Sequence, residues 1–483
     1  MRKSFEIIKN NLLLIVLVMQ PFLDILAYIQ RDYSISLAGY IRLGLTVCMP
    51  LYTLFLTKKK KQFISVMAVI GGFCLLHILN TLREGLSGAF SDTKYLLLVA
   101  HAPVLLFSFL FLYEKESIKK QITIALIVNI IVSVLAFYIS YALNSGNCTY
   151  PLFQMGWTGW YVIPNAQSLI LVSLLPFAVY FAIKYCKYFF PIIVLPLIYM
   201  YTINGTKAAF GALLATFIGI FGFTILEFIL TNKNKFQFYK VLMASILIAV
   251  SLLCYSYSPR QIIDSTTESN RQQEQAALEE LINSDIEEEN EDGENKEIGN
   301  RRNIYLKYIN PNLIDRFGGE KVLDAYGKNL NSYGMSNMRL KKLIFGKLTW
   351  EECDFATHLV GFEYSKMQHN GDNFDLENDP QAILYYYGYI GATLYIVFLA
   401  YFVLRLLKQL IFHFKESFNL YNFMILLTLL LQIVSTIYSG YLLRRPNVAI
   451  YLVVVLLLIH CQTQPLLSKK KKGNASELAE EVK

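Results

Sequence analysis

The sequence predicts an all-α, polytopic membrane protein with about twelve transmembrane helices and one large extracellular loop region. Its 483 residues are 55% hydrophobic and only 17% charged, and their mean hydropathy is +0.40. The apolar residues gather in runs of about twenty, the length of helix that crosses a bilayer. Basic residues follow every second run, which favours an even number of spans.

Nine apolar runs precede the large loop and three follow it. No small-residue cleavage site follows the first run, so we interpret it as a retained helix and not as a signal peptide. Most later runs are separated by short polar connections. The expected spans are residues 11–29, 35–56, 63–82, 95–113, 122–143, 165–183, 189–203, 208–230, 241–257, 381–404, 421–439 and 448–461.

The lysine and arginine residues between the runs set the expected orientation. Basic clusters follow the second, fourth, sixth, eighth, tenth and twelfth runs, from Lys58–Lys61 to Lys469–Lys472. The positive-inside rule makes this side cytoplasmic and places both termini there. The formal net charge of +8 is therefore a feature of membrane topology, and no nucleic-acid partner is expected.

The chain divides into four parts. Residues 1–257 carry transmembrane helices 1–9, residues 258–379 form the extracellular loop region, residues 380–462 carry helices 10–12, and residues 463–483 are a basic cytoplasmic tail. The first part of the loop, through residue 297, is too polar to bury a core, so we expect a solvated acidic linker. From residue 304 onward, amphipathic runs predict short helices that lie on the membrane surface and cap a cavity.

A charged segment directly precedes the tenth predicted span. Glu377, Asn378 and Asp379 end the loop, and Pro380 follows where a helix can begin without a backbone N–H. Both carboxylates would lie near the positive end of that helix dipole, which favours their charged forms. This segment is therefore the predicted centre of a functional site.

Several basic residues on the outer side are not explained by topology, among them Arg339 in the loop. Lys207 follows a very short turn and opens a helix, where backbone N–H groups and the ammonium make a candidate anion site. The alternative is a lysine that only reaches the membrane edge. Arg444 and Arg445 precede Pro446 at another helix start and can hold phosphate oxygens in a bidentate fork. Attraction to lipid headgroups is their alternative role.

Asp24 and Arg42 lie at similar depths in the first two spans, which run antiparallel. A charge inside a span costs about 3 kcal/mol on insertion scales, so it needs a partner or water. We expect a structural ion pair that joins the two helices, with a functional role as the alternative.

Metal and nucleotide chemistry find no support in the sequence. No His, Cys, Asp or Glu cluster has metal-ligand spacing, and no phosphate-binding glycine pattern occurs in a suitable context. We therefore expect no metal, no cofactor and no ATP-driven or redox reaction. Cys148 and Cys353 fall in outer segments, where either a disulfide between them or free thiols can be expected. His77 and His101, in outer halves of spans, are expected to be hydrogen-bonded packing residues.

Six short segments follow one another in an order that carries a family resemblance. They are residues 20–24, residues 156–157 with Asn165 and Pro176, residues 204–209, residues 337–339, residues 359–364, and Glu377-Asn378 with Gly388 and Gly391. In this order, with one dominant outer loop before the last three spans, they resemble motifs of the bacterial O-antigen ligase/polymerase-like superfamily of integral membrane glycosyltransferases.

The resemblance implies an enzyme of the bacterial plasma membrane whose active site faces outside. It would transfer a glycan, a surface polysaccharide or teichoic acid precursor, from an undecaprenyl-pyrophosphate carrier without a metal. The acceptor would be a glycolipid, a wall component or a second lipid-linked glycan, and membrane lipids surround the protein.

The resemblance also implies roles for particular residues. Arg339 and Lys207 stand at family arginine positions that bind the diphosphate, although lysine lacks the bidentate fork of arginine. Arg444 or Arg445 are further candidates for this contact. Glu377 stands where the ligases usually have a histidine that activates the acceptor hydroxyl, and Asp379 is the second candidate for this base.

A transporter or flippase of lipid-linked oligosaccharide is the competing interpretation. Such proteins often have two related halves joined by a cytoplasmic connection. Here the longest connection is predicted outside and the halves look unrelated. Ligase and polymerase stay open, because they differ in the acceptor and share the donor chemistry.

Overall fold

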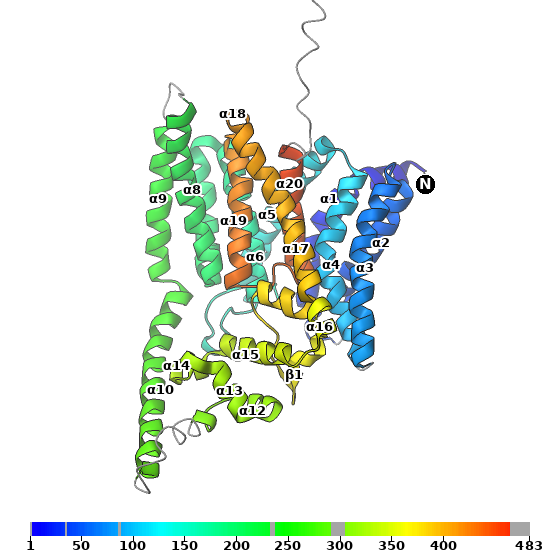
Figure 1. The fold of residues 1–483 in the computed structure, drawn as a ribbon. Helices are drawn as coiled ribbons and strands as arrows, with labels where there is room; N and C mark the ends of the chain where they lie inside the picture. The colour runs from blue at the N-terminus through cyan, green and yellow to red at the C-terminus, as the bar shows by residue number, and fades with distance from the viewer. Residues whose placement is uncertain (1, 34–35, 86–87, 232–236, 291–304, 464–483) are drawn as a thin grey trace, which may run out of the picture.

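The computed structural model describes residues 2–33, 36–85, 88–231, 237–290 and 305–463. Long helices form one bundle, and a cap of short helices covers one end of it (Figure 1). Within the described residues, the only strands are a short antiparallel pair in the cap, β1 (Gln368–His369) and β2 (Asp372–Asn373). The predicted all-α class is therefore confirmed.

The long helices come in two groups separated by the cap. Before the cap they are α1 (Arg2–Ile29), α2 (Leu37–Leu56), α3 (Lys60–Glu84), α4 (Ala89–Leu112), α5 (Lys115–Ala142), α6 (Pro164–Cys186), α7 (Phe190–Asn204), α8 (Lys207–Thr231), α9 (Phe238–Ser256) and α10 (Pro259–Asn290). After it come α17 (Asp379–Phe412), the short α18 (Phe414–Ser417), α19 (Leu420–Tyr438) and α20 (Pro446–Gln462).

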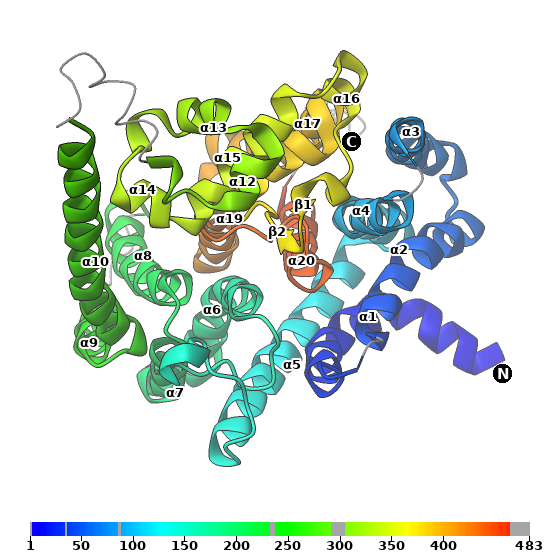
Figure 2. The same ribbon diagram turned by 90° about the horizontal axis from the view of Figure 1, so that it is seen from below.

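The cap consists of short helices. They are α12 (Pro311–Phe317), α13 (Gly319–Tyr326), α14 (Ser332–Ser336), α15 (Met338–Glu351) and α16 (Phe355–Val360), with 3-10 turns η3 (Gly327–Asn329) and η4 (Tyr364–Met367). Two further 3-10 turns, η1 (Pro151–Phe153) and η2 (Lys187–Phe189), lie between helices of the bundle. Seen from the cap end, α15 and α16 lie toward α17 and α19, while the ends of α1, α5 and α7 stay uncovered (Figure 2).

Ten stretches among the described residues are long and apolar enough to cross a membrane. One of them, Pro164–Asn204, contains both α6 and α7, and the 17-residue apolar helix α20 is shorter than the others. Each of the twelve predicted spans therefore corresponds to a helix. The chain is a multi-pass membrane protein.

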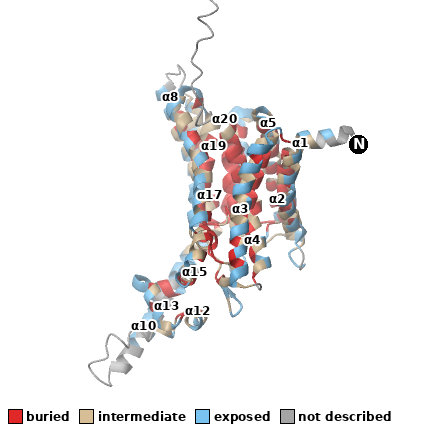
Figure 3. Cartoon of the chain, turned by 45° about the vertical axis from the view of Figure 1, so that its right-hand side comes forward, coloured by how far each residue is buried: buried red, intermediate tan, exposed pale blue. Residues whose placement is uncertain are grey.

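Helix α20 lies inside the bundle, packed against α4, α5, α6, α17 and α19. Its sequence is apolar on every side, which is typical of a helix in contact with protein all round. Nearly all of its residues are buried, as the red colour in Figure 3 shows. Helix α3, in contrast, exposes Leu75 and Leu79 on its outer surface, as a lipid-facing helix does.

The acidic segment after α9 is helical. Helix α10 continues without interruption through Pro259–Asn290, so most of the segment expected to be a solvated acidic linker is helical. Residues 291–297 of that predicted linker lie outside the described residues. The segment is rich in Glu and Gln, which are good helix formers, and a solvated helix can form without a core of its own.

Helix α17 has a kink next to the cap. It begins at Asp379 with Pro380 in its first turn, in agreement with the sequence. At Gly388 the backbone φ is +64°, a left-handed conformation that glycine adopts without strain. A Cβ at this position would lie 2.5 Å from backbone atoms of Leu359 and Gly361. The end of α16 therefore packs directly against the kink and holds the cap there.

Candidate functional site

The candidate site lies where the cap meets the bundle, and Arg444 is at its centre. The Arg444 side chain is only 1% exposed, and its guanidinium uses all five N–H groups. Burial lowers the pKa of Arg444, but the neighbouring carboxylates and tyrosines raise it more, so the pKa lies well above its usual value. The acceptors are Asp379 Oδ1 (3.0 Å), Asp375 Oδ1 (2.9 Å), the Tyr95 hydroxyl (2.6 Å) and the carbonyl oxygens of Leu376 and Glu377.

Asp379 is equally enclosed. It is fully buried, and its Oδ1 accepts from the Tyr441 N–H (2.8 Å) and from Arg444 Nε. Its Oδ2 accepts from the Leu443 N–H (3.0 Å). The Asp379–Arg444 pair therefore fastens the loop between α19 and α20 to the first turn of α17.

The same loop contacts the segment before α17 through its backbone. Gly440 and Tyr441 both have positive φ, +64° and +66°. A Cβ on Gly440 would lie 1.3 Å from the Glu377 carbonyl oxygen, so only glycine fits there. For a tyrosine the left-handed conformation costs about 1–2 kcal/mol. The bond from the Tyr441 N–H to Asp379 offsets part of this cost.

Glu377 lies between two cations from α15. Arg339 Nε is 2.6 Å from Glu377 Oε2, and Lys342 Nζ is 3.1 Å from Oε1. Arg339 also donates to the Tyr438 carbonyl at the end of α19, and its side chain is 58% exposed. Sequence reasoning paired Arg339 with Glu377 as site residues but missed Lys342. The signal was present, because positions three apart on a helix lie on one face.

Arg445 has a different environment from its neighbour Arg444. Its guanidinium carbon lies 4.4 Å from the centre of the Tyr441 ring, a cation–π contact. Its Nε is buried without a hydrogen-bond partner among the described residues. Of the two arginines, Arg445 is therefore the one that has an N–H group available for a further hydrogen bond.

Lys207 belongs to a second cluster, at the start of α8. Its Nζ lies 3.2 Å from Asp264 Oδ2, and Arg260 Nη2 lies 2.5 Å from Asp264 Oδ1. Burial raises the pKa of the Asp264 carboxyl, but the two cations lower it more, so its pKa lies below the usual range. Arg260 also donates to the Tyr150 hydroxyl (3.0 Å). Sequence reasoning missed Arg260.

The two clusters are not in direct contact. Within the described part of the chain, no hydrogen bond or ion pair joins Lys207 or Arg260 to Arg339, Lys342 or Glu377. The structure thus brings five of the six predicted site residues on the cap side together, and it places Lys207 elsewhere on the cap end of the bundle. The five are Arg339, Glu377, Asp379, Arg444 and Arg445.

A family model described as O-antigen ligase like membrane protein matches residues 7–463. The chain belongs to this family. No curated protein and no solved structure matches the chain significantly. Membership of the O-antigen ligase-like family indicates a membrane enzyme of the glycosyltransferase type, a ligase or polymerase of lipid-linked glycans.

The residues that the family model matches include both clusters. They also include the ion pair expected in the first two helices. Arg42 Nη2 lies 2.8 Å from Asp24 Oδ1, and both side chains are buried. The Gln20 side chain accepts from Arg42 Nε (3.3 Å), and Asn447 donates to Asp24 Oδ1 (3.2 Å). The pair therefore joins α1, α2 and α20 in this O-antigen ligase-like protein.

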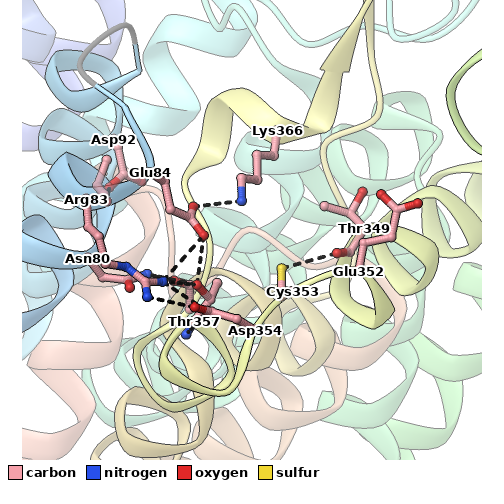
Figure 4. Close-up of polar contacts among 12 residues, drawn as sticks. Asn80, Arg83, Glu84, Asp92, Thr349, Glu352, Cys353, Asp354, Thr357 and Lys366 are labelled. Carbon is pink, nitrogen blue, oxygen red and sulfur yellow. Dashed lines mark hydrogen bonds and ion pairs between the residues drawn. The ribbon is translucent and has the colours of Figure 1, made fainter.

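Charged contacts also fasten the cap of this O-antigen ligase-like protein to α3 (Figure 4). Arg83 Nη1 lies 2.7 Å from Asp354 Oδ2, and Lys366 Nζ lies 2.7 Å from Glu84 Oε2. The hydrogen bond from Arg83 holds the pKa of the Asp354 carboxyl well below its usual range. Asp354 in turn caps α16 by accepting from the Thr357 N–H (2.9 Å).

The two histidines expected to be packing residues are buried and hydrogen-bonded. His77 Nε2 lies 2.9 Å from Asp92 Oδ2, and its Nδ1 lies 2.7 Å from the Val360 carbonyl oxygen. His101 Nδ1 lies 2.7 Å from Thr46 Oγ1. The first of these links α3 and α4 to the end of α16.

No group of three or more potential metal ligands occurs within the described residues. Cys148 and Cys353 are free thiols, so the disulfide considered from the sequence is not formed. An apolar pocket of about 100 Å³ lies between α17, α18, α19 and α20 at the end of the bundle opposite the cap, without a charged side chain in its lining.

Proposed function

We propose that this protein transfers an undecaprenyl-pyrophosphate-linked glycan, a surface polysaccharide or teichoic acid precursor, to an acceptor at the outer face of a bacterial plasma membrane. It acts as a ligase or polymerase, independently of metal. The observation that carries the proposal is the position of Glu377 between Arg339 and Lys342, at the junction of the cap with α17. A carboxylate next to two cations supplies both a base and a site for a leaving diphosphate.

The proposed reaction is a displacement at the anomeric carbon with inversion. The acceptor oxygen forms the new bond to this carbon, the bond to the diphosphate oxygen breaks, and Glu377 takes the acceptor proton. Arg339, Lys342 and Arg445 stabilise the diphosphate, on which negative charge accumulates in the transition state. Lys207 and Arg260 form a second phosphate contact on the same end of the bundle.

Burial and hydrogen bonding favour Glu377 over Asp379 as the base. Each oxygen of Asp379 already accepts a hydrogen bond, and the side chain is fully buried, so an acceptor hydroxyl has no access. Glu377 is 23% exposed and is held only by the two cations that would bind the diphosphate. Donor binding would draw those cations to the phosphates and release the carboxylate for proton transfer.

Burial and hydrogen bonding also favour Arg445 over Arg444 as the arginine that binds the diphosphate. Arg444 is buried and has no free N–H group, whereas Arg445 is partly exposed and its Nε has no hydrogen-bond partner among the described residues. Arg444 then has a structural role, fastening the loop between α19 and α20 to the first turn of α17.

Replacement of Arg339 or Lys342 by alanine is expected to raise the KM for the donor about 10- to 100-fold, because each charge-assisted hydrogen bond contributes about 1.5–3 kcal/mol. The test uses purified protein in liposomes with a defined undecaprenyl-pyrophosphate glycan and separate candidate acceptors, with the product identified by mass analysis. Lys347→Ala is the matched control, since Lys347 lies on the same helix but pairs with Glu351 on its exposed face.

The product of this assay decides between the functions. Chain extension identifies a polymerase, and transfer to a glycolipid identifies a ligase. Translocation of the donor without a covalent product would support a flippase instead. Donor KM values of Arg339→Ala and Lys342→Ala equal to that of Lys347→Ala would contradict the assignment of the two cations.

Asp264→Asn is expected to lower the KM for the donor about three- to tenfold at low ionic strength. In the unchanged protein the carboxylate neutralises one of the two charges of Lys207 and Arg260, and its loss leaves both available to phosphate. This decrease in the donor KM should become smaller as salt is added. Glu352→Gln is the control, because Glu352 lies between Arg316 and Lys321 in the cap in the same way. Equal KM values for the two variants would argue against phosphate binding at Lys207.

A further inference from the structure

A second polar network lies inside the bundle, below the loop that carries Arg444 and Arg445. It draws on helices α1, α2, α4 and α20, and its side chains are buried except that of Asn447, which is partly exposed. Its members are Gln20, Asp24, Arg42, Thr46, His101, Asn447 and Tyr451. They form two layers, because Gln20 and Asp24, Arg42 and Thr46, and Asn447 and Tyr451 are each four residues apart on one helix.

The layer nearer the cap contains an incompletely bonded carboxylate. Asp24 Oδ1 accepts from both Arg42 Nη2 (2.8 Å) and Asn447 Nδ2 (3.2 Å). Asp24 Oδ2 is buried and has no hydrogen-bond partner among the described residues. Because Arg42 and Asn447 both donate, this oxygen is an acceptor that lacks a donor.

In the second layer, His101 presents another acceptor. The Thr46 hydroxyl donates to the Arg42 carbonyl (3.1 Å), so its oxygen accepts from the Nδ1–H of His101 (2.7 Å). In the neutral imidazole this leaves Nε2 with a lone pair. Nε2 is buried and has no partner within the described residues.

Tyr451 contributes a third unpaired group to the network, its hydroxyl. It lies one turn below Asn447 on α20, and the Asn447 side chain donates to Asp24. Its hydroxyl is buried and, like the two acceptors, has no hydrogen-bond partner in the described part of the chain. The network therefore combines two acceptors without a donor and one hydroxyl without an acceptor.

Unpaired polar groups destabilise the interior of a membrane protein. An unpaired buried polar group costs several kcal/mol when no water can reach it. A single group with two O–H donors and one lone pair could pair all three: it would donate to Asp24 Oδ2 and His101 Nε2 and accept from the Tyr451 hydroxyl. Buried water molecules typically make about three such bonds.

We propose that Asp24, His101 and Tyr451 form a binding site for a hydroxyl-bearing ligand within the cap-side half of the bundle. Bond counting makes a resident water the best match, since a saccharide hydroxyl has one O–H and would leave one acceptor unpaired. A saccharide hydroxyl is the other source of the same chemistry, and that version rests on the proposed function. The proposal of a resident water does not depend on the proposed function.

Tyr451→Phe tests the site, because it removes one oxygen atom and changes no shape. Tyr326→Phe is the matched control, since Tyr326 in the cap also has a buried hydroxyl without a described partner. Two quantities are measured for both variants: the melting temperature of purified protein without substrate, and the KM values for the lipid-linked donor and for the acceptor.

A resident water predicts a melting temperature about 1–3 °C lower for Tyr451→Phe than for Tyr326→Phe, with unchanged KM values. A saccharide hydroxyl predicts an unchanged melting temperature and a five- to thirtyfold rise in one KM, about 1–2 kcal/mol. A Tyr451→Phe protein that melts at the same or a higher temperature than the control, with both KM values unchanged, would overturn the proposal. Failure of the transfer assay itself would leave the melting comparison decisive.

Discussion

Glu377→Gln is expected to lower the kcat of glycan transfer by about 10²- to 10⁴-fold, the usual contribution of a positioned general base. Glutamine keeps the shape of the side chain and can still accept a hydrogen bond from Arg339, but it cannot take the acceptor proton. The KM for the donor should stay the same or fall, because the variant no longer neutralises Arg339 and Lys342. Single-turnover kinetics with preformed donor complex measure the chemical step directly.

Glu351→Gln provides the comparison for this variant. Glu351 lies on α15 and pairs with Lys347, away from the cluster around Glu377. It should support transfer at the unchanged rate. If Glu377→Gln also retained kcat within about threefold, the acceptor proton would have to leave by another route, and Glu377 would be reduced to an ion-pair partner.

The long apolar helices could be predicted from sequence because the bilayer imposes their length and composition. Even α20, which has only 17 residues, is recognisable as an uninterrupted apolar run. The helical structure of α10 could not be predicted from sequence in the same way. The composition of residues 258–297 predicts a solvated segment, but composition alone does not decide whether such a segment is helical.

The candidate site was partly predictable. The charges of Glu377 and Arg339 stand out at the edge of apolar sequence, and the fold brings them to 2.6 Å. Lys342 was missed because it is one lysine among several on a cap helix. Arg260 was missed because it opens a segment expected to be a solvated linker. Their roles depend on tertiary contacts, which the order of residues does not reveal.

The adjacent arginines Arg444 and Arg445 show this limit most clearly. In the sequence they are indistinguishable, since both precede Pro446 at a helix start. In the structure both guanidinium groups lie over the Tyr441 ring, but Arg444 has every N–H engaged with carboxylates, carbonyls and a tyrosine, whereas the Nε of Arg445 has no partner among the described residues.

Arg444→Ala is expected to destabilise the protein severely, by about 3–5 kcal/mol, because it leaves the buried Asp379 carboxylate without its cation. Asp379→Asn should cost less, since the amide keeps an oxygen for the Tyr441 or Leu443 N–H. The double variant Arg444→Met/Asp379→Leu should be more stable than the sum of the single changes predicts, because it removes both charges together. Thermal unfolding in detergent measures all three.

The comparison with Arg445→Ala separates folding from catalysis. This variant should melt within about 1 °C of the unchanged protein and lose donor affinity, since Arg445 has no carboxylate partner among the described residues. Arg444→Ala should show the reverse: a lower melting temperature, but a near-normal KM in the fraction that remains folded. A stable Arg444→Ala protein with impaired donor binding would instead place Arg444 in contact with the diphosphate, and the buried pair with Asp379 would then have to open during the reaction.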